Sequence, residues 1–86
     1  MTTTFVFDGN EIEVKNDLSN FTLFINGEKV DHAKGVFRLE KDTLSGKLDC
    51  SDGNSKEITV KLVHAEGVYK AKLYVGGTLI DVRYMF

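Results

Sequence analysis

Few side chains in this sequence could act as a nucleophile, a base or a metal ligand. There is one cysteine, Cys50, and there are two histidines, His32 and His64. A thiol paired with a histidine can become a nucleophilic thiolate, so Cys50 and His64 are the first pair to consider. No helix N-terminus is evident to lower the pKa of the thiol, and Cys50 shares its strand parity with Leu48. The sequence therefore predicts a buried, inert thiol, and it predicts that His64 lies at the rim of a sheet.

The same residue types do not form a metal or cofactor motif. A structural zinc site takes four ligands at close spacing, and one cysteine with two separated histidines falls short. The segment Asp49–Asn54 carries oxygen donors and a glycine, as calcium loops do, but it lacks the alternate acidic residues and the closing glutamate. No glycine-rich phosphate-binding motif is present. We therefore predict a protein that is not an enzyme and that holds no metal and no cofactor.

Length and charge narrow the classes of protein further. The chain has 86 residues, enough for one domain over residues 1–86, and 42% of them are hydrophobic, which predicts a folded core. Eleven basic and thirteen acidic side chains give a net charge of −2, which supplies no strong field toward nucleic acid or an anionic membrane. No apolar stretch is long enough to span a bilayer, and a single cysteine is typical of a reducing compartment. We expect a cytoplasmic protein that does not contact a membrane.

Alternation of apolar and polar residues with a period of two runs through almost the whole chain. The segment Lys56–His64 is the clearest case, with apolar residues at every second position. Turns that contain glycine, such as Asn26-Gly27, separate these segments, which predicts consecutive antiparallel hairpins. We predict an all-β fold, an antiparallel β-sandwich or flattened barrel of about nine strands, one of them at Val36–Glu40.

Parity within the strands predicts which side chains face the core. In the last segment, Ile80, Val82 and Tyr84 are expected inward. At most one short helical turn is expected, near residues 17–19 or 42–44. Several apolar residues fall on the opposite parity of their strands, and they would mark a contact surface if they proved exposed and contiguous. These residues are Phe24, Val63, Tyr74, Leu79 and Met85.

The first and second halves of the sequence echo each other. In each half a strand is followed by a second strand, a glycine turn and a third strand in which an apolar residue precedes an aspartate. The spacing between the first two strands is not the same in the two halves. Two interpretations stay open. Either hairpins resemble one another because alternation and glycine turns limit the options, or the chain arose by duplication and Phe24 and Tyr74 occupy equivalent places.

Several segments follow one another along the chain in an order that resembles a known family. The segment Leu23–Val30 contains a strand and an Asn-Gly turn, and it is followed along the chain by Gly35–Phe37, Leu48–Cys50 and Gly67–Ile80. Over residues 11–82 this order resembles the repeated β-sandwich of the Fas apoptotic inhibitory molecule family. The resemblance implies a compact antiparallel sandwich that binds other proteins without catalysis, and it includes no catalytic motif.

Three functions stay open from the sequence. The first, which we prefer, is stoichiometric binding of another protein, as an inhibitor, immunity factor or adaptor, through an exposed sheet face or an edge strand. The second is binding of single-stranded nucleic acid on basic and aromatic side chains of the last hairpin and the strand before it. The third is a structural subunit of a homo-oligomer, such as a homodimer. The candidate binding residues are Phe24, Lys61, Lys70, Lys72, Tyr74 and Arg83.

Overall fold

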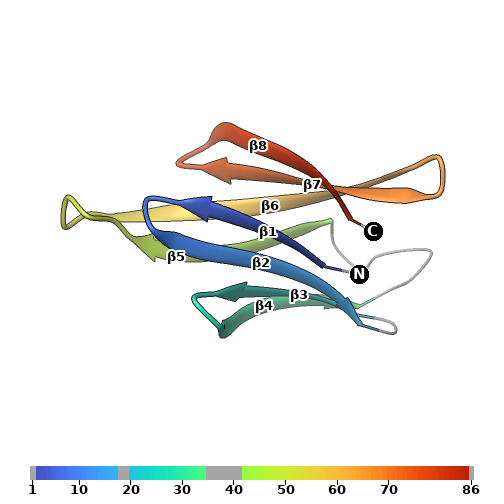
Figure 1. The fold of residues 1–86 in the computed structure, drawn as a ribbon, viewed down its shortest axis with the longest axis horizontal. Helices are drawn as coiled ribbons and strands as arrows, with labels where there is room; N and C mark the ends of the chain where they lie inside the picture. The colour runs from blue at the N-terminus through green and yellow to red at the C-terminus, as the bar shows by residue number, and fades with distance from the viewer. Residues whose placement is uncertain (1, 18–19, 35–41, 86) are drawn as a thin grey trace.

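Eight β-strands make up the part of the chain that the computed structural model describes, residues 2–17, 20–34 and 42–85 (Figure 1). The first four strands are β1 (Thr2–Phe7), β2 (Asn10–Asp17), β3 (Asn20–Ile25) and β4 (Glu28–Lys34). The last four are β5 (Thr43–Asp49), β6 (Ser55–Ala65), β7 (Val68–Val75) and β8 (Thr78–Met85). Strands β1 to β4 form the first antiparallel sheet and strands β5 to β8 form the second, each in chain order. The prediction of an all-β antiparallel sandwich is confirmed, and the two sheets do not close into a barrel.

The predictions of a ninth strand and of a short helical turn have different outcomes. The ninth strand, expected at Val36–Glu40, lies outside the described residues, and so do Leu18 and Ser19, where a helical turn was one option. At the other option, Thr43 and Leu44 begin β5 and pair with β6 instead of forming a turn of helix. Within residues 2–17, 20–34 and 42–85 there is no helix of the length and apolarity that crossing a bilayer requires.

A shared apolar core fills the space between the two sheets. Inward and outward side chains alternate along the central strands, as in β3, where Phe21, Leu23 and Ile25 are buried. The rings of Phe21 and Tyr69 connect the two sheets through an edge-to-face contact, with centroids 4.7 Å apart. Full burial of each such side chain contributes about 1.5–3 kcal/mol, so the alternation in the sequence supplies the main driving force for this fold.

The hairpin turns follow the chemistry of their residues. Asn26 and Gly27 both have positive φ, 50° and 83°, as a two-residue type I′ turn requires. Gly76 and Gly77 adopt the same region between β7 and β8, with φ of 57° and 84°. A Cβ at Gly27 or Gly77 would meet no neighbouring atom, so backbone conformation and not crowding selects glycine there.

The two sheets repeat one pattern of strand pairing. Their central strands pair buried aliphatic residues in the same order, Ile12 with Ile25 and Val14 with Leu23 in the first sheet, and Ile58 with Val75 and Val60 with Leu73 in the second. In both sheets the pairing with the outermost strand then shifts register, immediately before Phe24 in β3 and before Tyr74 in β7. The predicted equivalence of Phe24 and Tyr74 is confirmed, while the duplication itself stays a hypothesis.

The register shift is a β-bulge that adds one residue to β4 in the first sheet and one to β8 in the second. In β8, Leu79 lies opposite Tyr74 and Asp81 lies opposite Leu73, so Ile80 is the extra residue. Side chains alternate along a strand. Every residue after the bulge therefore faces the side opposite to the one that unbroken alternation predicts.

This bulge overturns the predicted faces of β8. The side chains expected inward, Ile80, Val82 and Tyr84, are 43%, 40% and 50% exposed. Met85, expected on the exposed side, is fully buried. Arg83 takes one of the inward positions, although its guanidinium group reaches the edge of the sandwich and stays half exposed.

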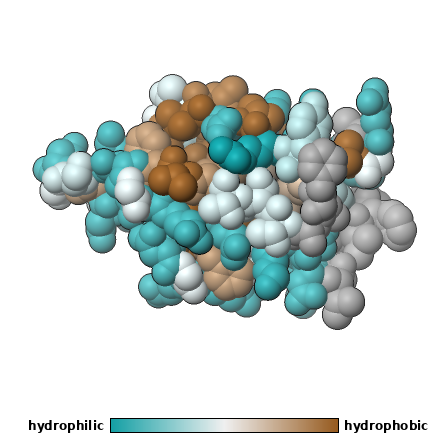
Figure 2. All heavy atoms as spheres, in the orientation of Figure 1, coloured by the Kyte–Doolittle hydropathy of each residue, from teal (hydrophilic) through white to brown (hydrophobic). Residues whose placement is uncertain are grey.

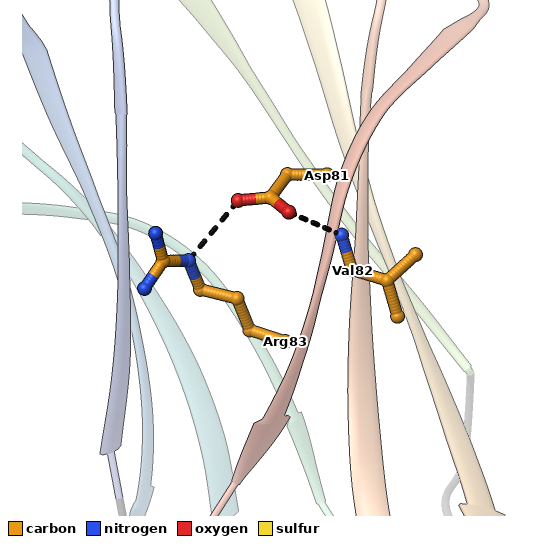
Figure 3. Close-up of polar contacts among 3 residues, drawn as sticks. All are labelled: Asp81, Val82 and Arg83. Carbon is orange, nitrogen blue, oxygen red and sulfur yellow. Dashed lines mark hydrogen bonds and ion pairs between the residues drawn. The ribbon is translucent and has the colours of Figure 1, made fainter.

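An aspartate holds the bulge in each sheet. Oδ1 of Asp31 accepts the backbone N–H of His32 at 2.8 Å, and Oδ1 of Asp81 accepts the backbone N–H of Val82 at 2.8 Å (Figure 3). The carboxylate thus supplies an acceptor next to the place where the strand pairing is interrupted. The apolar residue followed by aspartate, which the two halves of the sequence share, marks this bulge.

The second carboxylate oxygen distinguishes the two sheets. Oδ2 of Asp31 accepts the backbone N–H of Ser45 in β5 at 2.9 Å, which bridges the edges of the two sheets. Oδ2 of Asp81 instead accepts the Nε–H of Arg83 on its own strand at 3.1 Å (Figure 3). Gly46 contributes to the bridged edge, because a Cβ there would lie 2.8 Å from Cδ1 of Ile25 in β3 and 3.1 Å from Cγ2 of Val30 in β4.

Replacing the two aspartates tests this difference. We expect Asp31→Ala to lower the free energy of unfolding by about 1 kcal/mol more than Asp81→Ala, because it leaves one further backbone N–H without its acceptor. Equilibrium urea denaturation of both variants, followed by far-UV circular dichroism, gives the comparison. Equal destabilisation by the two substitutions would contradict the bridging role of Asp31.

Candidate functional site

The turn between β1 and β2 and the turn between β5 and β6 meet at one end of the sandwich. Asp8 in the first turn accepts two hydrogen bonds from Ser51 in the second, from the N–H to Oδ2 at 2.7 Å and from the hydroxyl to Oδ1 at 2.9 Å. The side-chain amide of Asn10 donates to the carbonyl oxygen of Asp49 at 3.2 Å. Beside these contacts lies a hollow of about 370 Å³, lined by Phe7, Asp8, Cys50, Ser51, Asp52 and Lys56.

Cys50 lines this hollow, and the protonation state of its thiol decides whether this residue can act as a nucleophile. Burial raises the pKa of the Cys50 thiol, and the carboxylates of Asp8 and Asp52 raise it further, while Lys56 opposes them. The thiol is therefore held in its protonated form at neutral pH, and this form is not nucleophilic. Cys50 precedes β6, whereas His64 lies near the other end of that strand, so the structure does not bring the two together.

His64 lies at the rim of the second sheet, as expected. It is exposed, and its ring stacks on the buried ring of Tyr69 with centroids 4.5 Å apart. Across residues 2–17, 20–34 and 42–85, no group of three or more histidine, cysteine, aspartate or glutamate side chains is placed to hold a metal ion. Most of the binding residues that the sequence predicts lie on the outward side of the second sheet.

Basic, aromatic and aliphatic side chains share that outward side. Cross-strand pairing arranges them in three rows over β6, β7 and β8, namely Val63, Lys70 and Tyr84; Lys61, Lys72 and Val82; and Thr59, Tyr74 and Leu79. Paired strands lie about 4.8 Å apart, so neighbours within a row are close enough to touch. Nζ of Lys70 lies 5.3 Å from the centroid of the Tyr84 ring, a cation–π contact within one row. We call these nine residues the lysine–tyrosine face.

The structure brings four of the predicted binding residues together on this face, and these are Lys61, Lys70, Lys72 and Tyr74. Phe24 does not join them. It lies on the outward side of the first sheet, where it pairs with Glu13. Its position is equivalent to that of Tyr74, but on the opposite side of the sandwich.

Arg83 does not join the lysines either. It faces inward opposite Ala71, and its guanidinium carbon lies 5.7 Å from the centroid of the Phe5 ring in β1. The bulge at Ile80 is the physical reason, because it turns the rest of β8 over by one residue. Arg83 is therefore not on the surface predicted for it from the sequence.

Sequence reasoning missed Val82 and Tyr84 as members of this face, since unbroken alternation puts both inward. The signal that could have found them is the apolar residue followed by aspartate at Ile80-Asp81, which the first half repeats at residues 30–31. Figure 2 shows hydrophobic side chains gathered along the upper margin of the molecule, where β8 lies in Figure 1.

The outward side of the first sheet has the same strand pairing as the lysine–tyrosine face but different side chains. At the positions equivalent to Leu79, Val82 and Tyr84 in β8, β4 has Lys29, His32 and Lys34. The three equivalent rows of the first sheet include Glu13 and Asp17, whereas the three rows of the lysine–tyrosine face contain no carboxylate. One backbone pattern thus supports a surface of mixed charge on one side and a basic, apolar surface on the other.

Comparisons with protein-family models, with curated proteins and with solved structures found no match. The resemblance to the Fas apoptotic inhibitory molecule family therefore stays a prediction. Function has to be inferred from the surfaces and contacts of this chain, because a sandwich fold by itself does not define a function.

The contact between the two turns makes stability depend on pH. The hydrogen bonds from Ser51 hold the pKa of Asp8 below its usual value. A carboxyl group whose pKa is lowered by folding stabilises the folded state above its unfolded pKa of about 3.9, and this contribution is lost as the pH falls through the folded value. We expect Asp8→Asn to melt at a lower temperature than wild type at neutral pH, and we expect this gap in melting temperature to close below about pH 4.

Thermal unfolding followed by circular dichroism at a series of pH values measures this gap. Asparagine tolerates the positive φ of 48° at position 8, so the substitution adds little backbone strain. Ser51→Ala removes the hydroxyl donor but keeps the N–H donor, and it should reproduce part of the gap. A gap of constant size across the pH series would show that the charge of Asp8 is not what stabilises the turn contact.

Proposed function

We propose that the protein binds another protein, without catalysis, through the lysine–tyrosine face. The observation that carries the proposal is the exposure of neighbouring apolar side chains on β8, with Leu79 48%, Val82 40% and Tyr84 50% exposed. The equivalent strand of the first sheet has polar or charged side chains at these positions, so the fold does not require apolar residues there. Contiguous exposed apolar side chains are typical of sites that contact a partner.

The composition of the face supports this proposal. Aromatic residues are enriched at the centres of protein interfaces, and Tyr74 and Tyr84 each combine a ring with a hydroxyl group at the surface. Lys70 and Lys72 are half-buried and lie beside these rings in the cross-strand rows, so their apolar stems add to the contact area of the face. Such a surface is suited to stoichiometric binding, as in an inhibitor, an immunity factor or an adaptor.

The outer edge of β8 is less suited to docking than the face. Inward-pointing charges and bulges on an edge strand oppose pairing with a further strand, and β8 has both. The side chains of Arg83 and Asp81, 53% and 45% exposed, form an ion pair that an added strand would cover. The face, and not the outer edge of β8, is therefore the surface suited to a partner.

Association of two copies through this face receives less support. A symmetric dimer would place the lysine–tyrosine face of one copy, with its three lysines and no carboxylate, against the same face of the other. Like charges placed across an interface are unfavourable. A structural subunit of a homo-oligomer is therefore not the function that we propose for this surface.

Affinity capture tests the proposal with a matched pair of variants. The face variant carries Leu79→Thr, Val82→Thr and Tyr84→Thr, which keep a β-forming residue while removing apolar area. The control variant carries Phe24→Thr and His32→Thr on the outward side of the first sheet. We expect wild type and control to capture the same proteins from a lysate of the source organism. We expect the face variant to capture at least about tenfold less of these proteins, which corresponds to a loss of about 1.4 kcal/mol in binding free energy.

Quantitative mass spectrometry of the captured proteins gives the readout, and urea denaturation shows whether both variants remain folded. Capture of the same proteins in unchanged amounts by the face variant would rule out the proposed surface. An equal loss in the control variant would also do so, because the site would then not be specific to the second sheet.

Single-stranded nucleic acid is a second candidate ligand, supported by one specific observation. Three lysines share the face with Tyr74 and Tyr84, and basic side chains beside aromatic rings can hold a phosphate backbone while bases stack. The net charge of −2 opposes this function.

Fluorescence anisotropy with a labelled single strand of about 12 nucleotides separates the two candidates. We expect no binding at about 50 mM salt, because protein binding is the proposed function. Binding that weakens steeply as salt is raised to about 200 mM, and that is lost on combining Lys70→Glu with Lys72→Glu, would establish the nucleic-acid function instead.

A further inference from the structure

The lysine–tyrosine face is ordered in columns as well as rows. Its apolar side chains Leu79, Val82 and Tyr84 follow one another along β8, and Lys70 and Lys72 follow one another along β7. A third lysine, in β6, lies directly opposite the second of these. Because β8 is the outermost strand of its sheet, the apolar column has lysines on one flank only.

We infer that the partner binds this face with an acidic amphipathic helix, whose apolar stripe lies along β8 and whose carboxylates face the lysines of β7 and β6. This inference rests on the protein-binding function proposed above and adds the chemistry of the partner. The length of the apolar column, the needs of the partner's backbone and the charge of the face each support it.

The apolar column has the length of a short helix. Leu79 and Tyr84 lie opposite Tyr74 and Lys70, which are four positions apart on β7. This separation corresponds to about 13 Å at about 3.3 Å per residue. An α-helix rises about 5.4 Å per turn, so about two and a half turns cover the column with apolar residues at three- and four-residue spacing.

A helix also satisfies its own backbone hydrogen bonds. A segment that lies on the face of a sheet has no strand ladder to join, so its N–H and C=O groups need partners within the segment itself. An extended segment would find partners only at the outer edge of β8, where the inward charges of Asp81 and Arg83 oppose an added strand. The face is therefore suited to a helix, as in other layered folds where helices cover sheets.

The charge of the face selects acidic residues on the partner. Lys61 and Lys72 are direct cross-strand neighbours, and like charges in this position are unfavourable. No carboxylate lies in the three rows to compensate them. Three of the eleven basic side chains lie on this face, which leaves eight basic against thirteen acidic side chains in the rest of the chain. A partner carboxylate beside Lys72 would relieve the repulsion, and a basic partner would increase it.

Selection from a display library of random peptides of about 16 residues tests this inference, because that length allows about four helical turns. The full chain serves as bait, and the face variant with three threonines serves for counter-selection. We expect the enriched peptides to be net negative, with apolar residues at three- and four-residue spacing. Their affinity, measured by fluorescence anisotropy, should fall about tenfold when Lys70→Gln and Lys72→Gln are combined, and it should weaken with added salt.

Lys47→Gln is the matched control for the lysine substitutions. Lys47 lies on the same outward side of the second sheet, in β5, but it pairs with Glu57 outside the three rows. We expect this substitution to leave the affinity of the selected peptides unchanged. An equal loss with Lys47→Gln would show that general charge, and not the lysines of the face, attracts the peptides.

Other outcomes would overturn the inference. Enrichment of neutral or basic peptides, apolar residues at alternate positions, or no enrichment at all would each contradict an acidic helix. A single strand of about 12 nucleotides that binds more tightly than every selected peptide would assign the face to nucleic acid. A dimer mass that disappears in the face variant would assign it to a second copy of the chain.

The failure of this inference is distinguishable from the failure of the proposed function. If the face variant loses captured proteins but the combined Lys70→Gln and Lys72→Gln variant retains them, protein binding stands and the acidic helix is wrong. If the face variant retains the proteins that wild type captures, the proposed function is itself wrong.

Discussion

The faces of β4 and β8 depend on one interaction, the hydrogen bond between an aspartate carboxylate and the next backbone N–H. Asp31 in β4 and Asp81 in β8 each hold a bulge that adds one residue to the strand. Because side chains alternate, this residue reverses every side chain that follows it. In β8 the reversal places Met85 in the core and leaves Tyr84 half exposed. A local backbone contact therefore decides both what fills the core and what the surface presents.

The same two aspartates take part in different edges of the sandwich. Asp31 links β4 to a backbone N–H of β5, and Gly46 allows Ile25 of β3 and Val30 of β4 to lie close to that strand. At the edge formed by β8 and β1, the second oxygen of Asp81 binds Arg83, and the position equivalent to Gly46 is Phe5. The guanidinium group of Arg83 lies over the Phe5 ring and covers this edge. The two edges of the sandwich therefore have equivalent backbones but different contacts. A hydrogen bond from Ser45 to Asp31 links β4 and β5, whereas the guanidinium group of Arg83 over the Phe5 ring links β8 and β1.

Much of the fold could be predicted because alternation along the central strands is uninterrupted. β6, β7 and the Asn26-Gly27 turn follow directly from the period of two and from turn chemistry. The faces of β8 could not be predicted in the same way, since hydrophobic periodicity favours burial of Val82 and Tyr84 and a bulge leaves no periodic signal. The residues of the candidate site could be predicted, or not, for the same reason. Its lysines and Tyr74 lie on strands without an inserted residue, whereas Arg83 lies after one.

Exposure of Val82 and Tyr84 carries a cost that another register of β8 would avoid. Without the bulge, these side chains would point into the core and Asp81 would point to solvent. Each half-exposed apolar side chain forgoes part of the roughly 1.5–3 kcal/mol that full burial supplies. The carboxylate hydrogen bond of Asp81, the burial of Met85 and the contact of Arg83 with the ring in β1 offset that loss. The exposed apolar area of Val82 and Tyr84 is area that a partner can bury. Asp81, which holds the bulge, therefore also supports the proposed binding surface.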